Sequence, residues 1–424
     1  MNKLKPHLLS IAGIAIIVIC IFYNVILPPV PLMAQDAPLV SEVLSRQRAK
    51  NSENVYWNTA GYLGSGGSVL ANKSAKYRID LAYFKRFVPT NLVSTFNFPF
   101  AVLIVGIGFY MFALSLNLKP LSAFTGAASI MLAGHFISCI YSGHTGKFFM
   151  LAYLCLALWL LTTGIRKRSI LCLLWSGVCG GLGVSNALDV GFIVIIFFAV
   201  WMVFLIYQTR NQKRWLKLSS GLVIACAAGL LYSASTIYSL AGLSKSESGS
   251  PTAKDNRSEA EKWNWATQWS LPKIETITFV MPGFFGFGLP ESPYWGSIGC
   301  DARWETQHVG FPRFSMSTQN MGIVVIALVL LAIITASTRK KHSKSTIYFW
   351  TVSMILALLF AYGRYFDFGG TSAGGFGPYR IFYWLPQMDS MRNPVKFLYP
   401  FMISLSILAA FGMEYVLGNQ KSST

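Results

Sequence analysis

Long apolar runs alternate with polar stretches along the whole chain. A helix needs about 20 mostly apolar residues to cross the roughly 30 Å of hydrocarbon in a bilayer. The runs that approach or exceed this length lie at about 8–27, 99–117, 121–141, 148–164, 170–188, 190–208, 218–242, 321–337, 346–363 and 397–417. The pattern therefore predicts an all-α, polytopic membrane protein with about ten transmembrane helices, built as a single integral membrane domain over residues 1–424.

Three of the polar connections are long, at about 28–98, 243–320 and 364–396. They all fall on the same side of the membrane when the helices are threaded in order. The region 279–286 combines aromatic residues with a Pro-Gly pair, which favours re-entrant or interfacial backbone over a spanning helix. Loops on a rigid scaffold are where binding and catalytic residues concentrate. We therefore expect the functional site on this side.

The charges are divided between the two sides. The chain has 35 Lys and Arg against 16 Asp and Glu, a formal net charge of +19. The short connections on the other side contain basic residues and no acid: Lys3, Lys5, Lys119, Arg166, Lys167, Arg168, Arg210, Lys213, Arg214, Lys217, Arg339, Lys340, Lys341, Lys344 and Lys421. This asymmetry is the positive-inside bias of membrane proteins. It predicts cytoplasmic termini and outward-facing long loops, and it argues against a nucleic-acid partner.

The first apolar run is longer than the 7–15 residues of a signal-peptide core, and Leu32-Met33-Ala34 is a poor cleavage site. We therefore expect an uncleaved first helix. Six of the seven cysteines lie in apolar runs, where Cys behaves as a small hydrophobic residue. Only Cys300 lies in an outer loop, so the sequence implies no disulfide between loops of this chain.

The first outer loop offers two candidate site residues. Asp36 follows the proline-rich exit of the first helix, which holds it close to the bilayer surface. A carboxylate at this height can act as a general base or bind a metal ion, although an ordinary solvated acid fits the position as well. Trp57 lies in the aromatic and glycine-rich stretch 56–67. Such a stretch suits packing on a sugar ring, and equally a membrane-interface belt.

Two short outer connections carry ionisable residues. His144 and Lys147 lie in the turn 142–147, where they could bind a phosphate by charge and hydrogen bonding. A histidine in a turn is often structural instead. Asp189 lies between two apolar runs, where an acid is costly unless it is used or paired. A solvated hairpin tip is the alternative for this residue.

The third outer loop ends with Arg392 and Lys396 just before the last apolar run. Arg can grip a phosphate with its forked guanidinium and Lys can do so as a point charge. Anchoring at the membrane interface is the alternative role. The sequence contains no nucleotide-binding loop, no dinucleotide fingerprint and no hydrolase or zinc-protease motif. ATP-driven transport therefore has no support.

The order of the outer motifs resembles one known family. The motifs are Trp-Asn and Gly-Gly within 57–67, Gly-His-x-Gly-Lys at 143–147, Trp-Ser-Leu-Pro and Val-Met-Pro-Gly-Phe-Phe-Gly within 269–286, Tyr-Trp-Gly at 294–296, and Leu-Pro-x-Met-x-x-Met-Arg-x-Pro-x-Lys-Phe at 385–397. Together they are similar to the bacterial YfhO-like membrane proteins. That family is placed with the GT-C glycosyltransferases, which use sugars linked to polyprenyl phosphate.

The resemblance implies a function and several residue roles. GT-C proteins place an Asp in the first outer loop just after the first helix, and Asp36 matches this position. The class often has a second acid in the next outer loop, where this chain has His144 and Lys147 instead. A divalent metal cofactor is therefore left open. Family members tend to be longer, which leaves open whether this chain is a shortened one.

The leading hypothesis is a GT-C-type glycosyltransferase of the bacterial cytoplasmic (inner) membrane. It would move a sugar from a polyprenyl-phosphate donor in the membrane to an acceptor on the non-cytoplasmic face. Asp36 would act as the base, and the basic residues of the outer loops would offset the charge of the leaving lipid phosphate. The alternative is a non-enzymatic lipid or polysaccharide flippase or assembly factor, which should bury ionisable groups within its helices.

Overall fold

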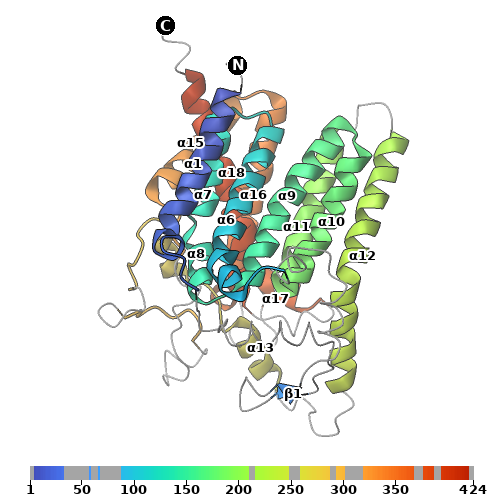
Figure 1. The fold of residues 1–424 in the computed structure, drawn as a ribbon, viewed down its shortest axis with the longest axis vertical. Helices are drawn as coiled ribbons and strands as arrows, with labels where there is room; N and C mark the ends of the chain where they lie inside the picture. Colours follow the sequence, from blue (N-terminus) through green and yellow to red (C-terminus); the bar gives the residue numbers. More distant parts are fainter. Residues whose placement is uncertain are drawn as a thin grey trace.

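The protein is a bundle of helices, in the computed structural model, with almost no sheet (Figure 1). The structure describes residues 4–32, 57–58, 65–66, 87–209, 215–247, 258–286, 293–300, 319–366, 376–385 and 393–419. The long helices are α1 (Lys5–Ile21), α6 (Thr90–Ser115), α7 (Pro120–Met131), α9 (Thr145–Lys167), α10 (Ile170–Asn186), α11 (Leu188–Thr209), α12 (Trp215–Glu247), α15 (Ile323–Ile334), α16 (Lys341–Ala361) and α18 (Leu398–Asn419).

Short elements connect the long helices. They are α2 (Tyr23–Ile26), α8 (Gly134–Tyr141), α13 (Glu259–Thr267), α17 (Pro378–Tyr383) and the 3-10 helices η1 (Lys273–Phe279), η2 (Thr335–Thr338), η3 (Gly363–Phe366) and η4 (Pro394–Phe397). Two-residue strands β1 (Trp57–Asn58) and β2 (Ser65–Gly66) pair antiparallel. In Figure 1, α1 begins and α18 ends at one end of the bundle, here called the terminal end. The opposite end, with α8, α13 and α17, is called the loop end.

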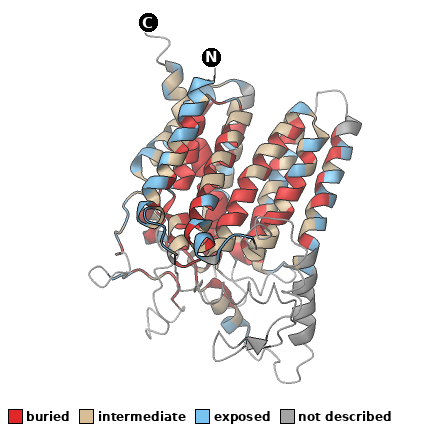
Figure 2. Ribbon diagram, in the orientation of Figure 1, coloured by how far each residue is buried: buried red, intermediate tan, exposed pale blue. Residues whose placement is uncertain are grey.

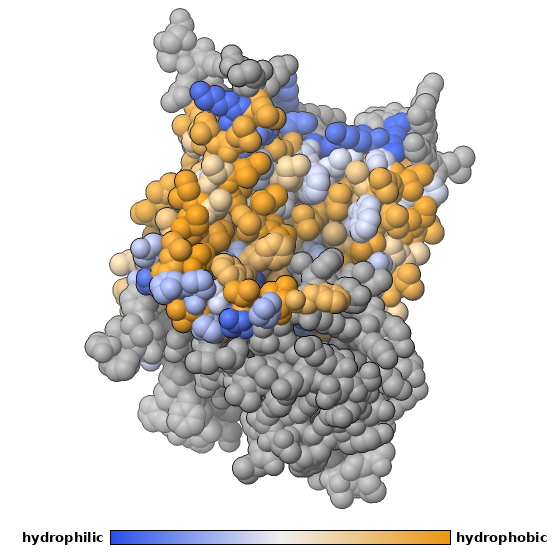
Figure 3. All heavy atoms as spheres, viewed as in Figure 1, coloured by the Kyte–Doolittle hydropathy of each residue, from blue (hydrophilic) through white to orange (hydrophobic). Residues whose placement is uncertain are grey.

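Several helices are long and apolar enough to cross a membrane. Among the described residues these are Asn91–Ser115, Thr145–Lys167, Leu188–Thr209, Ser343–Ala361 and Pro394–Gly418. A sixth is possible if α7 and α8, bent by 47° at residues 132–133, form one span. On the face drawn in Figure 3, an apolar band covers the middle of the bundle, with hydrophilic residues toward the terminal end and at the lower rim of the band. The helical fold and its long apolar helices therefore confirm the predicted class of an all-α membrane protein.

Shorter apolar helices occupy the four other predicted runs: Lys5–Ile21, Ile170–Asn186, Leu218–Ala234 and Ile323–Thr338. Each predicted run thus coincides with helix, while the count of ten crossings stays a prediction. Two loop boundaries differ from those predicted. Helix α6 begins at Thr90 and continues through Pro99, because neighbouring helices can compensate for a proline within a membrane helix. Helix α12 continues to Glu247.

The core lies along α18, which contacts α7, α15 and α16 and is buried over most of its length (Figure 2). An aromatic cluster joins α6, α11 and α16. Trp201 and Trp350 have ring centroids 4.9 Å apart, and Phe112 packs edge-on against both. The buried indole N–H of Trp201 donates to Thr162 of α9 at 3.1 Å. Because a buried donor needs a partner, this bond also fixes α9 against α11.

Candidate polar site at the loop end

The turn between α8 and α9 holds the His144–Lys147 pair. Gly143 adopts φ of +81°, a conformation that favours glycine and lets the chain reverse after α8. The backbone N–H of His144 then donates to the Cys139 carbonyl at 3.0 Å. The Lys147 ammonium donates to Nδ1 of His144, also at 3.0 Å. The sequence placed these two residues in one turn, and the structure brings their side chains into contact.

A close helix approach fixes this turn in position. Gly146, in the first turn of α9, packs directly against the Asn186 carbonyl oxygen at the end of α10. A Cβ at this position would overlap that oxygen. Glycine therefore allows α9 to begin where α10 ends, and Asp189 follows at the start of α11. The end of α10 and the starts of α9 and α11 therefore lie close together.

The same place holds an ion pair between Asp189 and Lys396. Their carboxylate and ammonium groups are 2.7 Å apart. The Lys396 side chain is only 5% exposed, whereas that of Asp189 is 43% exposed. The other Asp189 oxygen accepts the N–H of Val190 at 2.8 Å, as expected for an acid in the first turn of a helix. Of the alternatives for Asp189, the paired one is the one observed.

Backbone contacts position Lys396 on η4. The N–H of Val395 donates to the Trp269 carbonyl at 3.0 Å, and the N–H of Asn393 donates to the Ala266 carbonyl at 3.0 Å. The segment from α13 to Trp269 therefore holds η4 against the bundle. Because the Lys396 charge is already paired and nearly buried, it is less available to a ligand than its loop position implied.

The two pairs form one electrostatic unit. The charge of Lys147 acts on Asp189 as well as on the buried His135. Lys147 and Lys396 each carry a positive charge and Asp189 a negative one, so these residues sum to one net positive charge when His144 is neutral. Such a group at the end of a helix bundle can bind a singly or doubly charged anion such as a phosphate.

Sequence reasoning missed several buried polar residues next to this unit. His135 is fully buried, and its Nδ1 lies 3.0 Å from the Gln319 side-chain oxygen. Its Nε2 has no hydrogen-bond partner among the described residues. The Tyr399 ring lies edge-on to His135, and its hydroxyl is 3.8 Å from the Cys139 sulfur. The available signal was the four-residue spacing of His135 and Cys139, which places both on one helix face.

The segment around Asn320 hydrogen-bonds to the backbone at the break between α7 and α8. The N–H of Gly134 donates to the Asn320 carbonyl at 2.7 Å, next to the contact between His135 and Gln319. The N–H of Met321 in turn donates to the Phe279 carbonyl of η1. The broken helix is thus tied to the outer segment containing η1, and the backbone N–H group freed by the break is satisfied.

The structure does not describe the side chains of three predicted site residues. Asp36 and Arg392 lie outside the described residues. The backbone of Trp57 pairs with Gly66 in the β1–β2 ladder, and its side chain lies outside the description. The structure therefore unites His144, Lys147, Asp189 and Lys396. The functional roles of all seven residues stay predictions.

A second polar cluster forms around Glu275 of η1, which is 1% exposed. Its carboxylate accepts the Tyr294 hydroxyl at 2.7 Å and the Ser297 N–H at 2.8 Å. The Tyr294 oxygen accepts the Ile298 N–H at 3.0 Å. Burial raises the pKa of Glu275, and burial also raises the pKa of the nearby Cys300 thiol to about 11. Because its oxygens are engaged, Glu275 serves to anchor the segment 293–300.

A metal centre is not visible in the part of the chain that the structure describes. Within those residues, no three His, Cys, Asp or Glu side chains lie close enough together to hold an ion. Asp36, the acid predicted for this role, lies outside them. The described residues therefore do not test whether the protein binds a divalent metal.

Comparison with known proteins adds no family. Neither models of protein families nor curated proteins match this sequence.

Proposed function

We propose that this protein is a membrane glycosyltransferase of the GT-C type, related to the YfhO-like proteins. It transfers a sugar from a polyprenyl-phosphate donor to an acceptor at the loop end. The observation that carries the proposal is the charged unit of His144, Lys147, Asp189 and Lys396. It provides one net positive charge next to an apolar band, where the phosphate of a membrane-embedded donor would lie.

The reaction needs stabilisation of a leaving phosphate. The acceptor hydroxyl oxygen forms a bond to the anomeric carbon of the sugar while the bond from that carbon to the phosphate oxygen breaks. The phosphate leaves with the bonding electrons and gains a negative charge, which Lys147 stabilises by charge and His144 by hydrogen bonding. Asp36 takes the acceptor proton. Arg392 adds a second contact to the phosphate, and Trp57 packs on the sugar.

Asp189 and Lys396 act mainly by positioning. The carboxylate compensates the nearly buried Lys396 charge and, by attraction, holds Lys147 toward the same point. Preorganised charges of this kind lower a barrier because they do not need to reorient during the reaction. The proposal therefore assigns substrate contact to Lys147 and His144, and support to the ion pair.

The proposal includes an orientation. Lys119, Arg166 and Arg339 lie in or next to connections at the terminal end, on the side where α1 begins and α18 ends. By the positive-inside rule this side faces the cytoplasm of a bacterial cell, and the loop end faces outward. A lipid-linked donor presented on the outer leaflet would then meet the charged unit.

The test is sugar transfer from radiolabelled polyprenyl-phosphate hexose and pentose donors in membranes containing the protein. We expect Lys147→Met to lower the rate by about 100-fold, the effect of removing one electrostatic contact to a transition state. Asp36→Asn should lower it by about 100-fold or more, as for loss of a general base. Lys262→Met, at a surface pair with Glu259 on α13, should leave the rate unchanged. Unchanged transfer in Asp36→Asn would remove that residue as the base.

One observation favours a second function. Helices α7 and α8 are bent by 47° at the break between them, and the buried His135 lies directly after that break. Discontinuous helices with buried ionisable groups are typical of transporters. A lipid flippase would move a fluorescent polyprenyl-phosphate lipid between the leaflets of proteoliposomes and would show no sugar transfer. His135→Phe should abolish such movement, whereas a glycosyltransferase should retain transfer as long as this variant folds.

A further inference from the structure

Two segments at the loop end have opposite polarity. Helix α13 exposes Glu259 and buries Trp263, as expected for a helix in water. The stretch of residues 273–285, here called the η1 segment, does the reverse, because it buries the carboxylate of Glu275. After Lys273, every exposed side chain of this segment is apolar: Ile274, Ile277, Met281, Pro282 and Phe284. An apolar outer face of this kind marks contact with a membrane or with another protein.

Trp295 extends this apolar face. Its ring centroid lies 4.4 Å from that of Phe285 and 6.0 Å from that of Phe284. Its backbone N–H donates to the Phe285 carbonyl at 2.9 Å, and the residue is 62% exposed. Because tryptophan is enriched where a membrane meets water, this end of the face suits the membrane interface.

The start of the η1 segment lies at the level where a spanning helix ends. The span Ser343–Ala361 of α16 ends at Ala361, whose carbonyl accepts the N–H of Leu271 at 2.9 Å. The hydroxyls of Thr276 and Tyr362 are 3.0 Å apart. These two contacts hold the beginning of η1 beside the loop end of α16, and therefore near the membrane boundary.

The end of η1 lies deeper. The ring centroid of Phe279 is 4.8 Å from that of Phe401, which comes seven residues after Pro394 in the span Pro394–Gly418. At 1.5 Å per residue, this is about 10 Å along the span from its first residue. The η1 segment therefore runs from the membrane boundary into the level of the hydrocarbon.

A short neighbouring helix leaves room for this segment. Helix α15 has 12 residues and η2 adds 4, so at 1.5–2.0 Å per residue they extend about 25 Å, less than the roughly 30 Å of hydrocarbon. At the loop end of α15, the N–H of Met321 donates to the Phe279 carbonyl at 3.0 Å. Ile323 and Val324 are exposed there. The apolar outer surface of α15 therefore continues onto the η1 segment.

The polar groups of the η1 segment are bonded within the protein. Backbone that is not α-helical needs such internal partners inside a membrane. The N–H groups of Val280 and Met281 both donate to the Ile277 carbonyl. The Glu275 carboxylate, on the inner side, accepts the Ser297 N–H at 2.8 Å. These groups therefore need no water, and the segment meets this requirement for contact with lipid.

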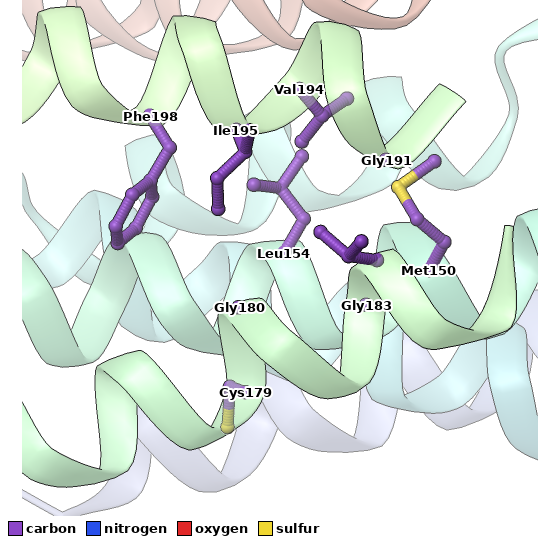
Figure 4. A pocket seen from close by; sticks show the side chains of 10 residues that line it. Met150, Leu154, Cys179, Gly180, Gly183, Gly191, Val194, Ile195 and Phe198 are labelled. Carbon is purple, nitrogen blue, oxygen red and sulfur yellow. The ribbon is translucent and has the colours of Figure 1, made fainter. Parts of the chain in front are cut away.

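An apolar space inside the bundle does not offer an alternative place for lipid. Figure 4 shows Met150, Leu154 and Phe198 around this space, which lies between α9, α10 and α11. It has room for about one water molecule, so a hydrocarbon chain does not fit. Lipid is therefore expected on the outer surface, where the η1 segment presents its apolar side chains.

We propose that the η1 segment is a re-entrant element whose apolar face contacts the acyl chains of the leaflet at the loop end. The sequence of 279–286 predicted re-entrant or interfacial backbone, and this inference adds the face, its depth and its partner. Lipid is favoured over a second protein because the face continues the outer surface of α15 and carries Trp295 at its edge. This lipid contact does not depend on the proposed sugar transfer.

The test is photolabelling of the unaltered, full-length protein in phosphatidylcholine nanodiscs. One probe is phosphatidylcholine with a diazirine in one acyl chain, and the other is a water-soluble diazirine. Mass spectrometry then identifies the labelled residues. We expect the acyl probe to label Ile277, Met281 and Phe284. The water-soluble probe should label α13 at Glu259 and should not label these three residues.

Ile277→Asp tests the contact further, because a charge is costly where a side chain faces lipid. We expect this variant to lose labelling of Met281 and Phe284 by the acyl probe. Ala260→Asp is the matched control, since it adds the same charge at an exposed position of α13. It should leave the labelling of the η1 segment unchanged.

Two results would overturn the proposal. One is labelling of Ile277, Met281 and Phe284 by the water-soluble probe and not by the acyl probe. The other is labelling of these residues by neither probe, which would show that protein, such as a second copy of the chain, covers the face. If Ile277→Asp does not fold, the labelling of the unaltered protein still decides. Acyl labelling without sugar transfer would reject the proposed function alone, and transfer without acyl labelling would reject this inference alone.

Discussion

The ammonium of Lys396 lies 2.7 Å from the carboxylate of Asp189, although the two residues belong to segments far apart in the sequence. Lys396 is nearly buried at the start of the last helix, and Asp189 begins α11. A nearly buried charge is tolerated only where a counter-charge or hydrogen bonds compensate its loss of hydration. This pair therefore joins η4 to α11 at the point where Lys147 also lies.

Asp189→Asn should destabilise the protein because it leaves Lys396 without its counter-charge. Removing one partner of a fully buried pair costs about 3–5 kcal/mol, and exposed pairs contribute below about 1 kcal/mol. Since Asp189 is 43% exposed, we expect an intermediate loss of about 1–3 kcal/mol. Thermal unfolding in detergent, followed by tryptophan fluorescence, measures this loss.

The double variant Asp189→Asn with Lys396→Met provides the control. It removes both charges and should recover most of the stability lost in Asp189→Asn. Glu259→Gln breaks the exposed pair with Lys262 on α13 and should change the unfolding free energy by less than about 0.5 kcal/mol. If the double variant is as unstable as Asp189→Asn alone, the unpaired Lys396 charge is not the cause.

Gly146→Ala should destabilise the loop end because the new methyl group would overlap the Asn186 carbonyl oxygen. Displacing a backbone group in a packed region costs about 1–3 kcal/mol. The same change at Gly180 meets only Ile195 at 3.7 Å and should be neutral or slightly stabilising, since alanine favours helix. Equal unfolding midpoints for the two variants would contradict the close approach of α9 and α10.

The pH dependence of stability should report on Glu275. Burial raises its pKa in the folded protein above the ordinary value of 4.5, so the folded state holds this proton more tightly than the unfolded state. Stability from this group is present below pH 4.5 and is lost as pH rises through the folded pKa. Unfolding midpoints measured from pH 4 upward should therefore fall less in Glu275→Gln than in the unaltered protein. Parallel pH profiles would show that the pKa is not raised.

Arg380→Met should destabilise the contact between α13 and α17. The Arg380 guanidinium carbon lies 4.0 Å from the Trp263 ring centroid, and the arginine is only 2% exposed. A desolvated cation–π contact of this kind contributes about 2 kcal/mol. We expect a loss of this order in chemical unfolding, and a smaller loss in Arg380→Lys, which keeps the charge. An unfolding free energy unchanged by Arg380→Met would show that the contact does not contribute.

The fold was largely predictable because hydropathy depends on residue type alone. Each predicted apolar run coincides with helix, and α1 begins on the same side as α18 ends, as the charge asymmetry required. The start of α6 was misplaced because Pro99 resembles a helix boundary in sequence, whereas the surrounding helices accommodate it. The break between α7 and α8 was missed because no proline or charge marks it.

The candidate site was predictable only in part. The His144–Lys147 contact is local, so one turn of sequence was enough to place both residues together. Lys396 was predicted as a free phosphate ligand, and its burial and its pairing depend on helices packing in three dimensions. His135, Tyr399 and Gln319 were missed since a polar residue within an apolar run gives no sign of what it will face.

The sequence by itself determined that the chain is built from apolar helices, that its basic residues gather on one side, and which outer loops carry ionisable residues. These properties follow from composition and order, which need no packing. Only the tertiary structure decided that Asp189 pairs with Lys396, that Gly146 lets α9 approach the end of α10, and that His135 lies against Gln319. Each depends on distances between segments remote in sequence, and those distances are fixed by how the helices pack.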